Sequence, residues 1–273
     1  MTELDIAGVG IWSSVCSNWQ TFCDGIENGN WQSDVPLMPG LIPPRERRRA
    51  PQSVKMAVEV LDQACTMASL DPATAAVVFS SAMGDMQITD YLCGVLAEPP
   101  RLVSPIRFHN SVHNATTGYW SIARDTHAPT SAVSALSFTA PMAFLEAAIQ
   151  VAEEDLPVLL VCQEMAAPKV LHSICQSDNP LSLSMALTKP GFCADPLASI
   201  RFDVEHKKVD WPALPHQLDV LFKGNPAAHI LPLIAAIAGQ GYTGTRKEAS
   251  FKFPLSEGAS LNITLIPGKP QKS

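Results

Sequence analysis

Short apolar strand patterns alternate with long helical patterns through the first 165 residues of this 273-residue chain. Three short, largely apolar runs, at 75–81, 131–136 and 157–162, are each next to a segment whose apolar residues recur at helical spacing. Strands that alternate with helices of ten or more residues favour a sheet with helices on both faces. The pattern therefore predicts an α/β fold.

The remaining elements follow from the same periodicity and from turn-forming residues. A first strand is expected at about 4–12, then a Pro-rich loop at 35–52 and a helix with Ser53 as its N-cap. Further helices are expected at about 85–96, 112–124 and 140–153. Beyond residue 165 the pattern weakens, and it predicts strands at 181–188 and 198–204, a helix at 226–239 and a hairpin of 248–253 and 259–266.

Composition and charge exclude several classes of function. A net charge of -7 gives no electrostatic basis for binding nucleic acid. No segment reaches the roughly 18 uncharged apolar residues that a membrane span needs. Seven scattered cysteines without C-x-x-C spacing predict reduced thiols, and we expect a soluble cytoplasmic protein. His109 and His113 stand four residues apart but lack the glutamate of a zinc motif, so no metal or cofactor is expected.

The order of several segments resembles the N-terminal half of a β-ketoacyl synthase of the thiolase fold. These segments are SSAMGD, SPIRFHNSVHNATTGYWSIA, TSAVSAL, SFTAPMAFLEAA and PVLLVC. The chain is most similar to the short ketosynthase-like proteins called chain-length factors, particularly those of bacterial aryl polyene pathways. The resemblance covers residues 4–165 and, more faintly, 220–266. It implies a layered α/β/α fold with a complete N-terminal half at 1–165 and a reduced C-terminal portion at 166–273 that completes the sheet.

Departures from the family indicate that the chain has no catalytic residues. The resemblance places Ser137 where an active ketosynthase has its cysteine nucleophile, and the segment that holds the first catalytic histidine is absent. His229 stands at the position of the second histidine. Gly224 occupies the position of the lysine that precedes it, and Lys223 is one residue early. A seryl hydroxyl is a poor nucleophile without a neighbouring base, so condensation chemistry is not expected.

The resemblance also implies partners. An active ketosynthase would complete a heterodimer, in which the strand carrying Val133 and Ala135 lies at the interface. Tyr119 and Trp120 would either fill the core or contact the partner. The tunnel for the growing chain would be lined by Met83, Met86, Thr89, Asp90 and Cys93, unless that face packs on its own core. A cluster of arginines would either bind an acidic acyl carrier protein or form an ordinary solvated surface: Arg45, Arg47, Arg48 and Arg49.

Two other readings remain open. The chain could be a divergent acyltransferase or thioesterase that uses Ser137 with His229, although no G-x-S-x-G elbow surrounds the serine. Against this, Ser137 could simply cap the following helix, and His229 could be a partly buried histidine at a helix start. The chain could also be a homodimeric protein that binds acyl chains.

Overall fold

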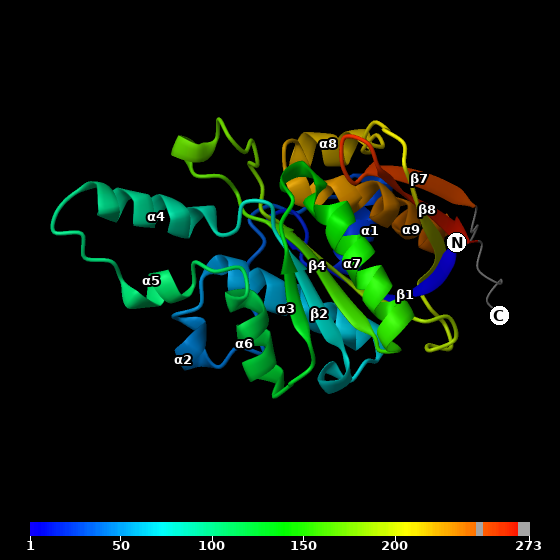
Figure 1. Cartoon of the computed structure of the whole chain (residues 1–273), viewed down its shortest axis with the longest axis horizontal. Helices are drawn as coiled ribbons and strands as arrows, with labels where there is room; N and C mark the ends of the chain where they lie inside the picture. The colour runs from blue at the N-terminus through cyan, green and yellow to red at the C-terminus, as the bar shows by residue number, and fades with distance from the viewer. Residues whose placement is uncertain (244–247, 267–273) are drawn as a thin grey trace.

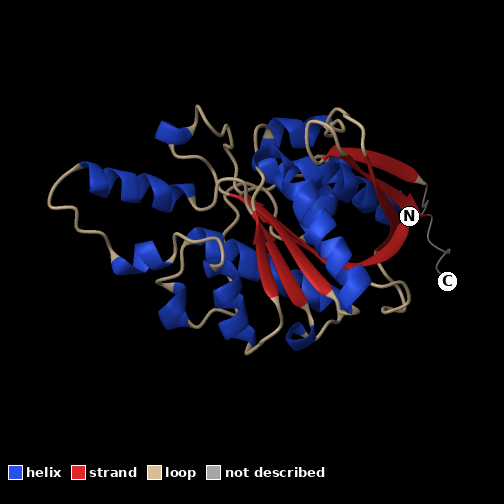
Figure 2. Cartoon of the chain, in the orientation of Figure 1, coloured by secondary structure: helices blue, strands red, loops and turns tan. Residues whose placement is uncertain are grey.

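A single eight-stranded sheet forms the centre of the computed structural model, which describes residues 1–243 and 248–266. The strand order is β3-β2-β4-β5-β1-β6-β8-β7. Helices cover both faces of the sheet (Figures 1 and 2). The expected layered α/β/α fold is confirmed.

Only the strands at one end of the sheet are parallel. β2 pairs in parallel with both β3 and β4, and all other neighbours are antiparallel. β5 lies between β4 and β1, so the second part of the chain supplies a strand to the middle of the sheet. The strands are β1 (Thr2–Ser13), β2 (Ala76–Ser80), β3 (Thr130–Val133), β4 (Val158–Glu164), β5 (Leu181–Thr188), β6 (Ala198–Glu205), β7 (Ala249–Pro254) and β8 (Ser260–Ile266).

The long helices agree with the sequence pattern, whereas several short ones were not predicted. The predicted helices are α3 (Gln52–Ala68), α4 (Met86–Ala97), α6 (Ala115–Arg124), α7 (Thr139–Glu154) and α9 (Leu231–Thr243). The unpredicted helices are α1 (Trp19–Asn28), α2 (Pro44–Arg47), α5 (Pro105–His109) and α8 (His216–Phe222). The expectation that Ser53 caps α3 is wrong, because the helix begins at Gln52 after Pro51. The Ser53 hydroxyl instead donates to the Asp85 carboxylate, 2.6 Å away.

The sheet separates two hydrophobic cores. On one face, α3 packs against β1, β4 and β5, with α6 beside it. On the other face, α7 and α9 form the larger core with α1. Gly8 of β1 shows how closely α3 approaches the sheet, because a Cβ added there would lie 2.6 Å from the Ala64 carbonyl oxygen. None of the described helices is long and apolar enough to cross a lipid bilayer.

The β3 edge of the sheet is open. The prediction of a buried strand at 131–136 is wrong: β3 ends at Val133, its residues alternate between exposed and half-buried, and no described strand pairs with its outer edge. Ala135 therefore lies outside the strand. α4 and α5 extend away from the body of the molecule (Figure 1). Large apolar side chains on these helices and on the connections around them are exposed: Leu96, Leu102, Ile106, Phe108 and Val112.

Candidate functional site

Three chain segments meet where the parallel strands end. The β2–α4 turn (81–85), the β3–α7 turn (134–138) and the end of β4 all follow the carboxyl ends of neighbouring strands. The Ser134 hydroxyl donates to the Ala82 carbonyl, 3.2 Å away, and so joins the first two turns. This edge of an α/β sheet is where ligand and catalytic groups commonly lie.

The β3–α7 turn offers no activated nucleophile. Its tightest point is Leu136, whose φ of 51° lies in the left-handed region and whose side chain is 69% exposed. Thr139 fixes the turn, since its hydroxyl accepts from the Ala135 N–H and donates to the Leu136 carbonyl. Phe138, not Ser137, occupies the N-cap position of α7, so the interpretation of Ser137 as a cap is wrong. In the described part of the chain the Ser137 hydroxyl makes no hydrogen bond.

The structure does bring Ser137 and His229 together, but the contact is made by the main-chain carbonyl of Ser137 and not by its hydroxyl. His229 lies in the short 3-10 helix Pro226–Ile230, and its Nδ1 is 2.8 Å from the Ser137 carbonyl oxygen. A carbonyl only accepts, so Nδ1 carries the proton and Nε2 has the lone pair. Burial lowers the pKa of His229, which favours this neutral form. The ring stacks on Trp211 with centroids 3.9 Å apart. The imidazole is therefore held as a packed, neutral group beside the turn.

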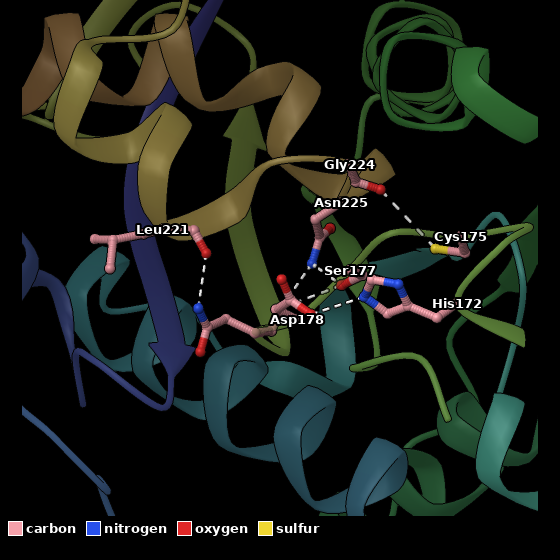
Figure 3. A network of polar contacts seen from close by, with 8 residues as sticks. His172, Cys175, Ser177, Asp178, Leu221, Gly224 and Asn225 are labelled. Carbon is pink, nitrogen blue, oxygen red and sulfur yellow. Dashed lines mark hydrogen bonds and ion pairs between the residues drawn. The ribbon is translucent and has the colours of Figure 1, made fainter. Parts of the chain in front are cut away.

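Gly224, which the sequence analysis assigns to the position of the family's lysine, is sterically closed to a side chain. Its φ is 71°, and an added Cβ would lie 2.8 Å from the Gln176 Cβ and 2.9 Å from the Gln176 carbonyl oxygen. Figure 3 shows the network that holds the 172–179 loop against this segment. Asn225 donates to the Ser177 hydroxyl and to the Asn179 carbonyl, each at 3.0 Å. A lysine at position 224 is incompatible with this packing.

Glu164, a buried carboxyl at the end of β4, anchors the β2–α4 turn. The sequence predicts that this strand ends at Cys162, whereas β4 continues to Glu164. Glu164 was therefore not among the residues predicted for the site. The side chain is fully buried. It accepts from the Ala82 N–H at 2.8 Å and from the Ser81 hydroxyl at 3.1 Å. Burial raises the pKa of Glu164 to about 7, although these hydrogen bonds act in the opposite direction.

This raised pKa predicts a pH-dependent stability. A carboxyl that binds its proton more tightly when folded loses stability as pH rises from its ordinary pKa of 4.5 to about 7. We expect the free energy of unfolding to fall by up to about 3 kcal/mol across this range relative to Glu164→Gln, which mimics the protonated form. Urea unfolding of both proteins at several pH values measures the difference. Parallel curves for the two proteins would contradict the prediction.

The residues proposed to line a tunnel divide into two groups. Met86 is 1% exposed and packs in the core beneath α3, so it is a core residue and cannot line an open tunnel. Met83 is half-buried against the same core. Thr89, Asp90 and Cys93 are exposed along the projecting part of α4. These three residues contact no core of their own chain.

Of the other residues predicted to contact a partner, some are buried or bonded within the chain and others are exposed. Trp120 is completely buried in its own core, which confirms the first of its two interpretations and excludes contact with a partner, whereas Tyr119 is only partly buried. Arg47 donates from Nε and Nη2 to the Ile42 carbonyl and stabilises its own loop, so it is not free for docking. The remaining arginines of the cluster are exposed: Arg45, Arg48 and Arg49. The described residues contain no group of three or more side chains arranged to bind a metal.

Comparison with solved structures shows the same fold in ketosynthase assemblies. The ketosynthase (ApeO) in complex with its chain length factor (ApeC) from Xenorhabdus doucetiae matches with a TM-score of 0.67 and 18% identity, covering 97% of this chain and 100% of that chain. The ishigamide ketosynthase/chain length factor matches with a TM-score of 0.73 and 14% identity, over 96% and 98%. The complex AntDE:AntF, a type II acyl-carrier protein with its ketosynthase, matches with a TM-score of 0.75 and 10% identity, over 97% and 99%.

The sequence itself identifies the family. A search for similar curated proteins gives no match. Residues 18–221 match the model of the β-ketoacyl synthase N-terminal domain. Because this match spans more than half of the chain, the protein belongs to the β-ketoacyl synthase N-terminal domain family and has its thiolase-like fold.

Proposed function

We propose that the chain is a non-catalytic chain-length factor that forms a heterodimer with an active ketosynthase. The β3–α7 turn carries this proposal. At the turn where an active relative needs a thiol, the chain has the apolar Leu136 and the unactivated Ser137. His229 donates the proton on its Nδ1 to the Ser137 carbonyl and makes no hydrogen bond to the Ser137 hydroxyl. The closed position at Gly224 removes the lysine as well. These features leave the fold without its condensation chemistry.

The open edge of β3 and the exposed apolar side chains support the presence of a partner. A strand edge with free main-chain groups pairs readily with another strand. The described part of the chain also exposes large apolar side chains of the kind that proteins normally bury in an interface, including Phe108 at 65% exposed, Ile122 at 73% and Leu136 at 69%. Val133 and Tyr119 are both half-buried and are the proposed contacts. In this proposal, a ketosynthase of the same fold would pair through the corresponding edge strand.

The finer parts of the proposal concern the product and the second partner. Thr89, Asp90 and Cys93 are exposed in the single chain, which supports a place in the wall of the acyl tunnel. Arg45, Arg48 and Arg49 are exposed cations suited to an acidic acyl carrier protein. We assign the pair to aryl polyene biosynthesis in the cytoplasm, with residues 1–165 as the ketosynthase-like half and 166–273 as the reduced half.

The assembled pair tests the proposal directly. The purified chain should not turn over acyl-thioesters alone, and Ser137→Ala should leave the condensation rate of the pair nearly unchanged because no acyl group is carried on Ser137. Replacing the ketosynthase's own cysteine by alanine is the matched control and should abolish activity. A loss of more than about 100-fold in Ser137→Ala, about 2.7 kcal/mol in the barrier, with the pair intact would favour a serine-dependent acyltransferase or thioesterase instead.

A further inference from the structure

α4 is buried only at its first turn. Met86 and Ile88 are buried there, and beyond them no side chain of this fully described helix is buried. The Tyr91 hydroxyl accepts from the Ser104 N–H at 3.2 Å, so the outer part of α4 is joined to the segment before α5, which projects with it (Figure 1). The direction of α4 therefore depends on how its first turn is held.

Asp85 holds this turn as the N-cap of α4. Its Oδ1 accepts from the Ile88 N–H at 3.0 Å, which is the capping hydrogen bond. Its Oδ2 accepts from the Ser53 hydroxyl at 2.6 Å. Ser53 lies in the first turn of α3. One carboxylate therefore joins the first turns of two helices.

The link continues from α3 into the sheet. Gln163 of β4 donates from Nε2 to the Ser53 carbonyl at 3.0 Å, and its Oε1 accepts from the Ser182 hydroxyl of β5 at 2.9 Å. Ser53, Gln163 and Ser182 are 7%, 3% and 0% exposed. None of them has a buried polar side-chain atom without a partner in the described chain. Because buried polar networks with every member paired are rigid, this one connects the start of α4 firmly to the middle of the sheet.

A small change at the cap produces a large displacement along α4. The helix has 12 residues, which is about 18 Å of length, so a tilt of about 10° at its start moves its far end by about 3 Å. Thr89, Asp90 and Cys93 form the exposed face of α4 on this part of the helix. The position of the exposed face is therefore set by the polar groups that hold the first turn.

We infer that Ser53, Gln163 and Ser182 are positioning residues, which fix the direction of α4 through its cap and thereby determine the length of the product. The hold on α4 is a property of this chain alone. The effect on product length rests on the proposed function, in which the exposed face of α4 lies in the wall of the acyl tunnel. Separate measurements test the two parts.

Amide hydrogen exchange of the full chain tests the hold on α4. Ser53→Ala removes the donor to Asp85 and leaves the capping bond, so exchange in α4 should become at least about fivefold faster, while exchange in α7 stays unchanged. Ser80→Ala is the matched control, because it also removes a buried serine hydroxyl, which donates to the Val161 carbonyl at 2.8 Å outside the network. Unchanged exchange of α4 in Ser53→Ala, or an equal increase in Ser80→Ala, would overturn the inference.

A second set of variants shows whether Ser53 acts through Asp85. Asp85→Ala alone should make exchange in α4 faster still, because it removes the cap as well as the link. Adding Ser53→Ala to Asp85→Ala should then change the exchange by less than about twofold, because the partner is already absent. The full effect of Ser53→Ala in both backgrounds would show a different route and overturn the inference. Gln163→Met should also speed exchange in α4, and no change there would exclude Gln163 and Ser182 from the network.

The assembled pair tests the effect on the product. With Ser53→Ala the products should spread over a wider range of lengths, while the condensation rate stays within about twofold, because the reacting groups belong to the ketosynthase. A simple loss of stability would lower the rate and leave the lengths unchanged. Faster exchange in α4 with an unchanged range of products would support the hold on α4 and contradict the proposed place of α4 in the tunnel wall.

Discussion

Ala132→Pro is expected to prevent assembly with the ketosynthase while leaving the chain folded. The carbonyls of Pro129 and Val133 accept from the N–H groups of Val77 on β2 and of Ser81 just after it. Because main-chain groups alternate sides along a strand, the N–H of Ala132 points to the open edge. Proline removes that donor and places its ring there without breaking a bond to β2. We expect affinity for the partner to fall at least about 100-fold, about 2.7 kcal/mol.

The control for this variant is Ala132→Thr, which keeps the N–H and favours a strand. It should co-elute with the ketosynthase as the wild-type chain does. Val133→Asp should also block assembly, because the charge would be desolvated in the interface. Val133 packs partly against its own core, however, so that variant tests folding and assembly together. If folded Ala132→Pro protein co-elutes at full yield, the β3 edge is not the interface.

Gly224→Ala is expected to be the most destabilising single methyl addition in the 166–230 region. An alanine at a φ of 71° is strained, and its Cβ would collide with Gln176. Together these effects should lower the free energy of unfolding by about 2–5 kcal/mol. Urea unfolding monitored by circular dichroism measures the loss. Gly224→Lys should cost at least as much, so a single substitution cannot restore the family's lysine.

Gly29→Ala is the matched control for Gly224→Ala. Gly29 has a φ of 69°, and nothing lies within 4 Å of an added Cβ. In Gly29→Ala the free energy of unfolding should fall by only about 1–2 kcal/mol, which is the cost of an alanine in the left-handed backbone conformation. The difference between the two variants measures the packing against the 172–179 loop. Equal losses would show that this loop yields easily and that the position is not closed.

The sequence predicts a helix or strand well where all the residues of the segment have the same degree of burial. β5 was expected at 181–188 and is found there, because a strand buried on both faces has a continuous pattern that ends at turn residues. α1 was missed because its N-terminal signal is unusual: Asn18 and Thr21 form the capping box in place of a glutamate or glutamine. β3 looked buried because Ala132 and Val133 are apolar, and residue types alone do not show that the strand lies at an open edge of the sheet.

The sequence predicts which residues lie at the candidate site but not how they contact one another. Resemblance to the family placed Ser137 and His229 near one another, and the structure brings them together. It could not show that the contact is made by a carbonyl, because a hydrogen bond to the main chain leaves no mark in the residue types. The left-handed backbone of Leu136 was equally hidden, since leucine rarely adopts it. The closed packing at Gly224 depends on the 172–179 loop, far from it in sequence.

The two outer strands of the sheet differ in a way that limits the size of any assembly. β3 presents an uncharged edge, whereas β7 carries Lys252, which pairs with Glu205, and ends at Pro254, which has no N–H to offer. Lysine and proline are the residues that natural sheets use to discourage further pairing. Pairing with a partner through β3 would therefore leave β7 at the outer end of this subunit's sheet. On this chain's side, the combined sheet would not readily extend beyond β7.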